Sequence, residues 1–132
     1  MLTSIALSLI LSQNLQVTFK PAQPITFAFE HNGDDGSAGK PGFRLWCDGA
    51  IIKNYAVTEA EAGKNPTKSA DGTFTYTLIY PGFPTLGVRN CSISAFNSIA
   101  QLDSDKSNVI PFIIGTAPST PVRFKFVITI GG

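Results

Sequence analysis

The chain has 132 residues and a formal charge of +1, and only 14% of its residues are charged. This length suits one domain with a single core of ordinary size. The ten lysines and arginines are spread along the sequence without a basic stripe or a charged block, which argues against nucleic-acid binding and against a charged tail. Short runs of β-branched and aromatic residues, separated by Gly, Pro, Asn and Asp, predict an all-β protein.

Residues 1–13 form an apolar N-terminal extension. Its start, MLTSIALSLILS, resembles the apolar region of a signal peptide, but no Lys or Arg precedes it and the run is too short to cross a membrane. We therefore expect the segment to remain in the mature protein, and we expect no membrane span. Its pattern fits either a strand or a short helix, and periodicity does not separate the two.

Residues 14–114 are expected to form one β-sandwich domain. Apolar alternation and turn signals predict strands over residues 15–20, 25–30, 43–47, 50–55, 73–80, 88–97 and 109–114. Asp48-Gly49 is a strong signal for a two-residue hairpin turn, and residues 58–62 could form one helical turn inside a polar loop. Pro111 cannot donate a ladder hydrogen bond, so we expect it at a sheet edge.

The two cysteines indicate the register between the segments FRLWC and CSISA. If these strands are antiparallel neighbours, a single register gives three apolar pairs: Phe43 with Ala95, Leu45 with Ile93, and Cys47 with Cys91. Cys47 would be hydrogen-bonded to Ala50 across the hairpin, so its pair with Cys91 would be a non-hydrogen-bonded one, in which Cα atoms lie about 4.5 Å apart. The residues fit either a Cys47–Cys91 disulfide or two buried thiols, and a disulfide would imply an extracellular or virion environment.

The same register predicts which residues occupy the opposite face of these strands. They are Arg44, Trp46, Ile51, Lys53, Ser92 and Ser94. Trp46 beside Ile51 is either a contact patch or a surface that another segment of the chain covers.

The order of ITFAFEH, GFRLWCDG, TFTYTLIY, VRNCSISAFN and SNVIPFII resembles a fibronectin type III or related immunoglobulin-like domain. GFRLWCDG resembles the third strand of that family with its hairpin, and SISAFN, followed by a loop and Ser107-Asn108, resembles the sixth strand and its exit. The likeness covers residues 25–114. It implies an immunoglobulin/fibronectin III-like β-sandwich, here with an extra N-terminal segment and an extra C-terminal strand. Such domains serve as bacterial surface modules and phage decorations, so the resemblance implies binding or structure and no reaction.

The sequence gives little support for catalysis or for a metal site. His31 is the only histidine, and we expect it in a solvated loop with Asp34 and Asp35. Both cysteines are expected on the core face, which disfavours a thiol nucleophile. Asp34 and Pro41 stand where a phosphate-binding loop would need Gly and Ser or Thr. We therefore expect no catalytic, cofactor-binding or metal-binding residues, and no enzyme.

After a linker at residues 115–121, residues 122–132 have the pattern of a further strand. One face of it carries Val122, Phe124, Phe126, Ile128 and Ile130. Left unpaired, such a strand invites aggregation, so we expect it to pair either with its own sandwich or with a neighbouring subunit by β-augmentation.

These patterns favour a non-enzymatic structural protein, and the leading hypothesis is a phage capsid decoration, or cement, protein located in the virion. Its partners would be other copies of itself, as a homo-oligomer, and a capsid or other particle protein, with no nucleic acid and no cofactor. The alternative is a secreted or cell-surface module for adhesion or carbohydrate binding, in which Trp46 or Tyr55 would be the stacking platform.

Overall fold

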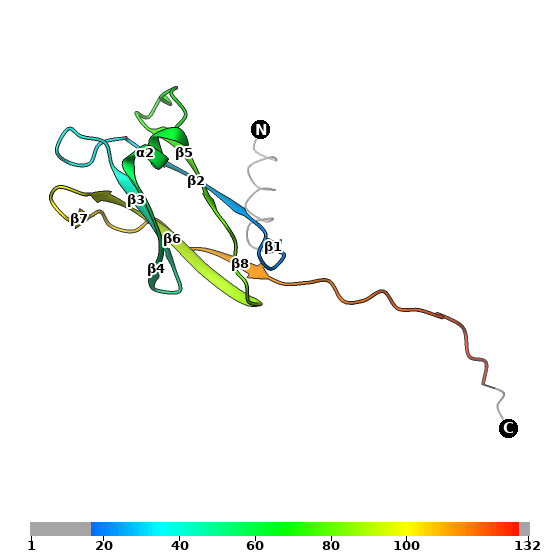
Figure 1. The fold of residues 1–132 in the computed structure, drawn as a ribbon. Helices are drawn as coiled ribbons and strands as arrows, with labels where there is room; N and C mark the ends of the chain where they lie inside the picture. Colours follow the sequence, from blue (N-terminus) through cyan, green and yellow to red (C-terminus); the bar gives the residue numbers. More distant parts are fainter. Residues whose placement is uncertain (1–16, 130–132) are drawn as a thin grey trace.

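The computed structural model describes residues 17–129, which form two β-sheets and one short helix (Figure 1). In chain order the elements are β1 (Thr18–Phe19), β2 (Ile25–His31), β3 (Gly42–Cys47), β4 (Ala50–Tyr55), α2 (Val57–Ala62), β5 (Phe74–Tyr80), β6 (Gly87–Asn97), β7 (Leu102–Asp103) and β8 (Ile110–Ile114). The structure is β-rich, as the composition predicts. The predicted extension at residues 1–13 lies outside the described residues.

The strands are divided unequally between the two sheets. The larger sheet has the strand order β1-β8-β6-β3-β4, with β7 paired to the end of β6, and the smaller sheet contains β2 and β5. β1 and β8 run parallel, whereas every other neighbouring pair runs antiparallel. None of the helices in residues 17–129 is long and apolar enough to cross a membrane.

Aromatic side chains hold the two sheets face to face. The ring centroids of Phe29 on β2 and Phe43 on β3 lie 4.7 Å apart, and those of Phe27 on β2 and Phe112 on β8 lie 6.0 Å apart. Tyr76 on β5 is fully buried beside Phe43. The core therefore lies between the sheets and is built from the inward residues that strand alternation predicts.

The predicted register between β3 and β6 is confirmed, with Cys47 opposite Cys91. The two cysteines form a disulfide, and their Cα atoms lie 4.1 Å apart, close to the spacing expected for a non-hydrogen-bonded pair. Asp48 and Gly49 form the turn, with φ angles of 53° and 83°. Positive φ at both central residues is what a type I′ hairpin turn requires, and Asp-Gly adopts it readily.

The hairpin differs from the predicted regular one beyond its first two residue pairs. The register shifts between Leu45 and Trp46, so Lys53 lies opposite Leu45 and does not share the outer face with Trp46. The Lys53 ammonium lies 4.8 Å from the centroid of the Tyr55 ring and 3.5 Å from a carboxylate oxygen of Glu59. The prediction for Lys53 was wrong because one extra residue in a β-bulge reverses the side chains that follow it.

The gap between the sheets is closed on the side of β4 and β5. The predicted helical turn is confirmed as α2, whose Ala60 is fully buried. The Tyr55 hydroxyl on β4 donates a 2.7 Å hydrogen bond to the carbonyl of Ile79 on β5 and so links the two sheets. Burial, with the charges of Glu59 and Tyr80 adding to it, raises the pKa of Tyr55 to about 12.

Pro111 lies inside β8, a strand with neighbours on both sides, but β1 pairs only with Ile113 and Ile114. At Pro111 the strand is therefore bordered on one side only, by Asn90 of β6. The missing N–H costs no ladder bond because it falls on the unpaired side, so the expectation of an edge position holds locally.

Candidate functional site

The C-terminal segment, residues 122–129, is the most apolar exposed part of the described chain. It forms no strand, and Figure 1 shows it running away from the two sheets. Its apolar side chains are almost fully solvent-exposed: Val122 75%, Phe124 89%, Phe126 90%, Val127 81% and Ile128 86%. Pairing of these residues with their own sandwich is therefore not what the structure has, whereas pairing with a neighbouring subunit stays a prediction. Ile130 lies outside the described residues.

The backbone of this segment departs from that of a regular strand. Arg123 has a φ of 56°, in the left-handed region, and interrupts the extended chain. Beyond it, the rings of Phe124 and Phe126 lie 6.4 Å apart between centroids, as neighbours two residues apart on one face do. Residues 124–129 can therefore present one phenylalanine face as soon as a partner strand orders them.

Trp46 and Ile51 share the outer face of the larger sheet, as predicted, but Trp46 is largely covered by its own chain. Its indole Nε1 donates a 2.9 Å hydrogen bond to the Ser94 hydroxyl, and the Lys106 ammonium lies 4.0 Å from the ring centroid. Ser92 and Ser94 are buried, and Ile51 is 39% exposed. Of the two alternatives for this face, coverage by another segment is the one that holds for Trp46.

The predicted stacking platforms for a sugar are therefore not available. The face of the Trp46 ring is occupied by Lys106, and its N–H group is already used by Ser94. Tyr55 is only 4% exposed, and its hydroxyl is held by the Ile79 carbonyl. A carbohydrate-binding aromatic residue needs an open ring face, which neither side chain presents.

His31 ends β2 and lies against the core more closely than a solvated loop residue would. Its ring packs edge-on against Phe43 at a centroid distance of 5.3 Å, and its Nδ1 accepts a hydrogen bond from the Gly33 N–H. Burial lowers the pKa of His31, and the charge of Asp34 opposes this shift. The imidazole therefore serves as a local structural acceptor, and its burial favours the neutral form.

The acidic residues beside His31 are engaged in shaping their loop. Asp34 accepts a hydrogen bond from the Gly36 N–H, and Asp35 accepts bonds from the N–H groups of Ser37 and Gly39. These side chains hold tight turns. Within residues 17–129, no group of three His, Cys, Asp or Glu side chains is placed to hold a metal ion.

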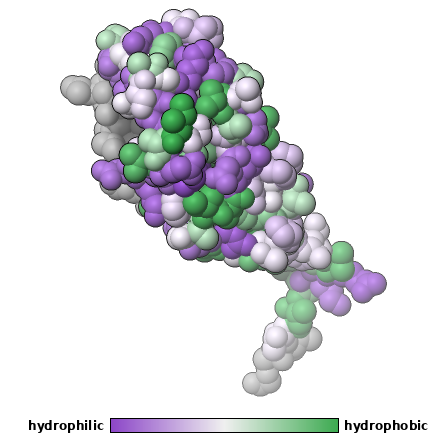
Figure 2. All heavy atoms as spheres, turned by 60° about the vertical axis from the view of Figure 1, so that its left-hand side comes forward, coloured by the Kyte–Doolittle hydropathy of each residue, from purple (hydrophilic) through white to green (hydrophobic). Residues whose placement is uncertain are grey.

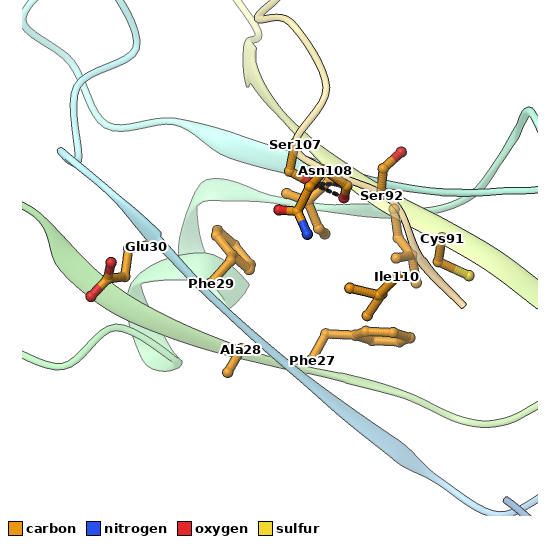
Figure 3. A pocket seen from close by; sticks show the side chains of 11 residues that line it. Phe27, Ala28, Phe29, Glu30, Cys91, Ser92, Ser107, Asn108 and Ile110 are labelled. Atoms are coloured by element: carbon orange, nitrogen blue, oxygen red, sulfur yellow. Dashed lines mark hydrogen bonds between the residues drawn. The ribbon is translucent and has the colours of Figure 1, made fainter. Parts of the chain in front are cut away.

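A groove that the sequence patterns did not predict runs along the edge of β2 that faces away from β5. Two adjoining cavities, of about 420 and 430 Å³, share Phe27, Ala28 and Ile110 in their walls. Figure 3 shows the side chains of Phe27, Phe29 and Ile110 directed into the first cavity, whereas the Glu30 side chain points away from it on the other side of β2. We call this feature, lined mainly by Ile25, Phe27, Phe29, Ile93, Ile110 and Phe112, the β2 groove.

The β2 groove exists because the smaller sheet ends at β2. Among the described residues, β2 pairs only with β5, and its other side has no neighbouring strand. The inner face of the larger sheet therefore extends beyond the smaller sheet and leaves Ile110 44% exposed. No sequence pattern of β2 itself distinguishes this open edge from a paired one, because alternation reports the buried face only.

The other exposed large hydrophobic residues of residues 17–115, which we call the body, belong to several elements and include Ile79 on β5, Val88 on β6 and Ile99 in a loop. Figure 2 shows hydrophobic residues in separate groups among polar ones on one face of the body, with further hydrophobic residues along the narrow C-terminal extension. The chain thus presents two candidate contact features: the C-terminal segment and the β2 groove. Comparison of the chain with family models, with curated proteins and with solved structures finds no match.

Proposed function

We propose that the protein is a non-enzymatic assembly component, a phage capsid decoration protein located in the virion, whose C-terminal segment joins it to other copies. The single observation that carries this proposal is the exposure of Phe124, Phe126 and Ile128, each at least 86%. Burying one such side chain contributes about 1.5–3 kcal/mol. Three apolar side chains with strand alternation thus offer a substantial binding energy that the monomer leaves unused.

The immunoglobulin/fibronectin III-like nature of the sandwich belongs to the same proposal. The strand order β1-β8-β6-β3-β4 opposite β2-β5, with the hairpin at Asp48-Gly49, supports it. Domains of this kind act as binding or structural modules. The disulfide between Cys47 and Cys91 supports a location outside a reducing cytosol.

Deletion of residues 116–132 tests the assembly role. Size-exclusion chromatography with light scattering should give an oligomer for the full chain and a monomer for the truncated chain. The truncated chain should keep its fold, with an unchanged circular dichroism spectrum, because residues 122–129 form no strand with the body. An unchanged oligomeric mass after truncation, or a full chain that is already a monomer at high concentration, contradicts the proposal.

The virion location has a test of its own. Peptides of this chain should be found by mass spectrometry in phage particles that have been purified through a density gradient. They should remain there after a high-salt wash, because apolar contacts do not weaken with ionic strength as exposed ion pairs do. Particles free of the chain would refute the decoration role and leave the self-assembly of the protein to be judged by the truncation alone.

A further inference from the structure

The two contact features of the surface fit each other. We propose that residues 124–129 of one copy add as a strand to the free edge of β2 in a second copy, with Phe124, Phe126 and Ile128 in the β2 groove. This inference rests on the proposed self-assembly and specifies where the acceptor lies.

Alternate residues of β2 direct their backbone N–H and C=O groups away from β5, where an added strand could bond to them. The Thr77 N–H donates to the Gly63 carbonyl, on the side of β5 away from β2, so the antiparallel pair of Ala28 with Thr77 is a non-hydrogen-bonded one. Likewise, the Thr75 carbonyl accepts from the Asn65 N–H. By alternation, the N–H and C=O groups of Ala28, and of the residues two before and two after it, point to the free edge.

Among the described residues, β2 is the open edge of the smaller sheet, because β5 is covered on the side that faces away from β2. Residues 63–65 lie along that side of β5 and make its outward hydrogen bonds, and Lys64 forms a bridge with Tyr76. An added strand in the smaller sheet can therefore pair only with β2. Exposed edges of this kind are acceptors for an extended segment in β-augmentation.

The side chains of the two strands match in their alternation. In β2, Ile25 and Phe27 point into the core, whereas Thr26, Ala28 and Glu30 are exposed. A strand placed beside β2 in the same sheet directs every second residue into the β2 groove. If the phenylalanine face of residues 124–129 points inward, Lys125, Val127 and Thr129 point outward to solvent.

The outward face also matches in charge. Glu30 is exposed on β2 and makes no ion pair within the described residues, and neither do Arg123 and Lys125. Opposite charges on neighbouring strands stabilise a sheet. The other apolar terminus, residues 1–16, contains no charged side chain and cannot supply this match. The charge pattern therefore favours the C-terminal segment as the occupant.

The geometry points to a second copy of the chain and not to the protein's own groove. Residues 116–129 make no hydrogen bond to the body, and Figure 1 shows them leading away from it. Pro118 and Pro121 favour an extended linker over a turn back to β2. Reciprocal exchange would give a closed dimer, and sequential exchange an open chain of copies.

A matched pair of substitutions in the donor tests which face is inserted. Phe126 and Val127 are 90% and 81% exposed in the free segment, so Phe126→Asp and Val127→Asp are equivalent unless a strand forms. We expect Phe126→Asp to weaken self-association at least tenfold in Kd and Val127→Asp to change it less than threefold. Equal effects of the two substitutions would overturn the inserted strand.

A second pair tests the acceptor. Ala28→Pro removes an N–H group at the free edge, whereas Ala28→Val keeps it. Only the proline variant should lose self-association, as measured by light scattering, while circular dichroism and the intact disulfide confirm its fold. If Ala28→Pro does not fold, Glu30→Lys replaces it, and this charge reversal should weaken association in low salt and lose its effect in high salt.

A mixture of two variant chains, one with an altered donor and one with an altered acceptor, provides the decisive test. A chain lacking residues 116–132 has only the acceptor, and the Ala28→Pro chain has only the donor. Each should be monomeric alone, and a mixture should form a 1:1 complex. If truncation abolishes assembly but β2 variants assemble normally, the acceptor inference fails while the proposed self-assembly stands. A monomeric full chain whose residues 124–129 are protected from hydrogen exchange would show docking in its own groove and overturn exchange between copies.

Discussion

Removal of the disulfide should cost a large part of the stability of this domain. Cys47 and Cys91 are 44 residues apart in sequence and join the neighbouring strands β3 and β6. Cross-linking a loop of about this length lowers the entropy of the unfolded chain by an amount worth about 4 kcal/mol at 25 °C. Domains of this size are usually stable by only about 5–15 kcal/mol. The double variant Cys47→Ala/Cys91→Ala should therefore remain folded, but with a much smaller free energy of unfolding.

Urea denaturation, monitored by tryptophan fluorescence, measures the loss in free energy of unfolding. Trp46 is the only tryptophan, it precedes Cys47 in β3, and its N–H group is bonded to Ser94. Its emission should therefore report the opening of β3 and β6. With a denaturant slope of about 2 kcal/mol per molar, which is usual for small proteins, a loss of about 4 kcal/mol lowers the urea midpoint by about 2 M.

Reduction of the unmodified chain provides the control, because it breaks the same bond without changing either residue. Its urea midpoint should fall with that of the double variant. The reasoning is refuted if the double variant lies within about 1 kcal/mol of the parent, an amount below what the loop entropy requires. It is equally refuted if the untreated chain has two thiols that react with an alkylating agent.

Two further predictions concern two buried tyrosine hydroxyls and His31. Tyr55→Phe should lower the free energy of unfolding by about 0.5–1.5 kcal/mol, because it removes the hydrogen bond to the Ile79 carbonyl. Tyr76→Phe should leave this free energy unchanged or raise it, because the buried Tyr76 hydroxyl has no hydrogen-bond partner in the described residues. A larger loss for Tyr76→Phe than for Tyr55→Phe in urea denaturation would contradict this. Burial lowers the pKa of His31 in the folded chain, so the unfolded chain binds a proton more readily. The contribution of His31 to the free energy of unfolding should therefore be fully present above about pH 6.5, the ordinary pKa of histidine. It should be lost as the pH falls from that value toward the lower pKa of the folded chain. The variant His31→Asn should lose this part of the pH dependence, and parallel curves for the variant and the parent between pH 5 and 7.5 would disprove it.

Much of the fold follows from local patterns in the sequence. The alternation in ITFAFEH and TFTYTLIY predicts β2 and β5, and the turn at Asp48-Gly49 places β3 beside β4. The pairing of Cys47 with Cys91 follows from a register that gives one apolar face and one cysteine pair at the same time. These features are predictable because period-two alternation and turn chemistry act between residues that are close in sequence or in register.

Other features depend on how distant segments approach each other. Lys106 covers the ring of Trp46 because residues after β7 follow the edge of β6, where Ser104 and Ser107 bond to its backbone. The bulge beside Leu45 moves Lys53 off the outer face. Neither has a sequence signature, because a hydrophobic pattern tells which face of a strand is buried and not which residues will lie over the other face.

The same distinction applies to the candidate site. Alternation in residues 122–129 is enough to predict an apolar face that requires a binding partner. The tertiary structure adds that residues 122–129 form no strand with the protein's own sheets and that, among the described residues, β2 has an unpaired edge beside an apolar groove. This difference arises because alternation specifies the faces of a strand, whereas the packing of the whole chain determines which strands pair with its two edges.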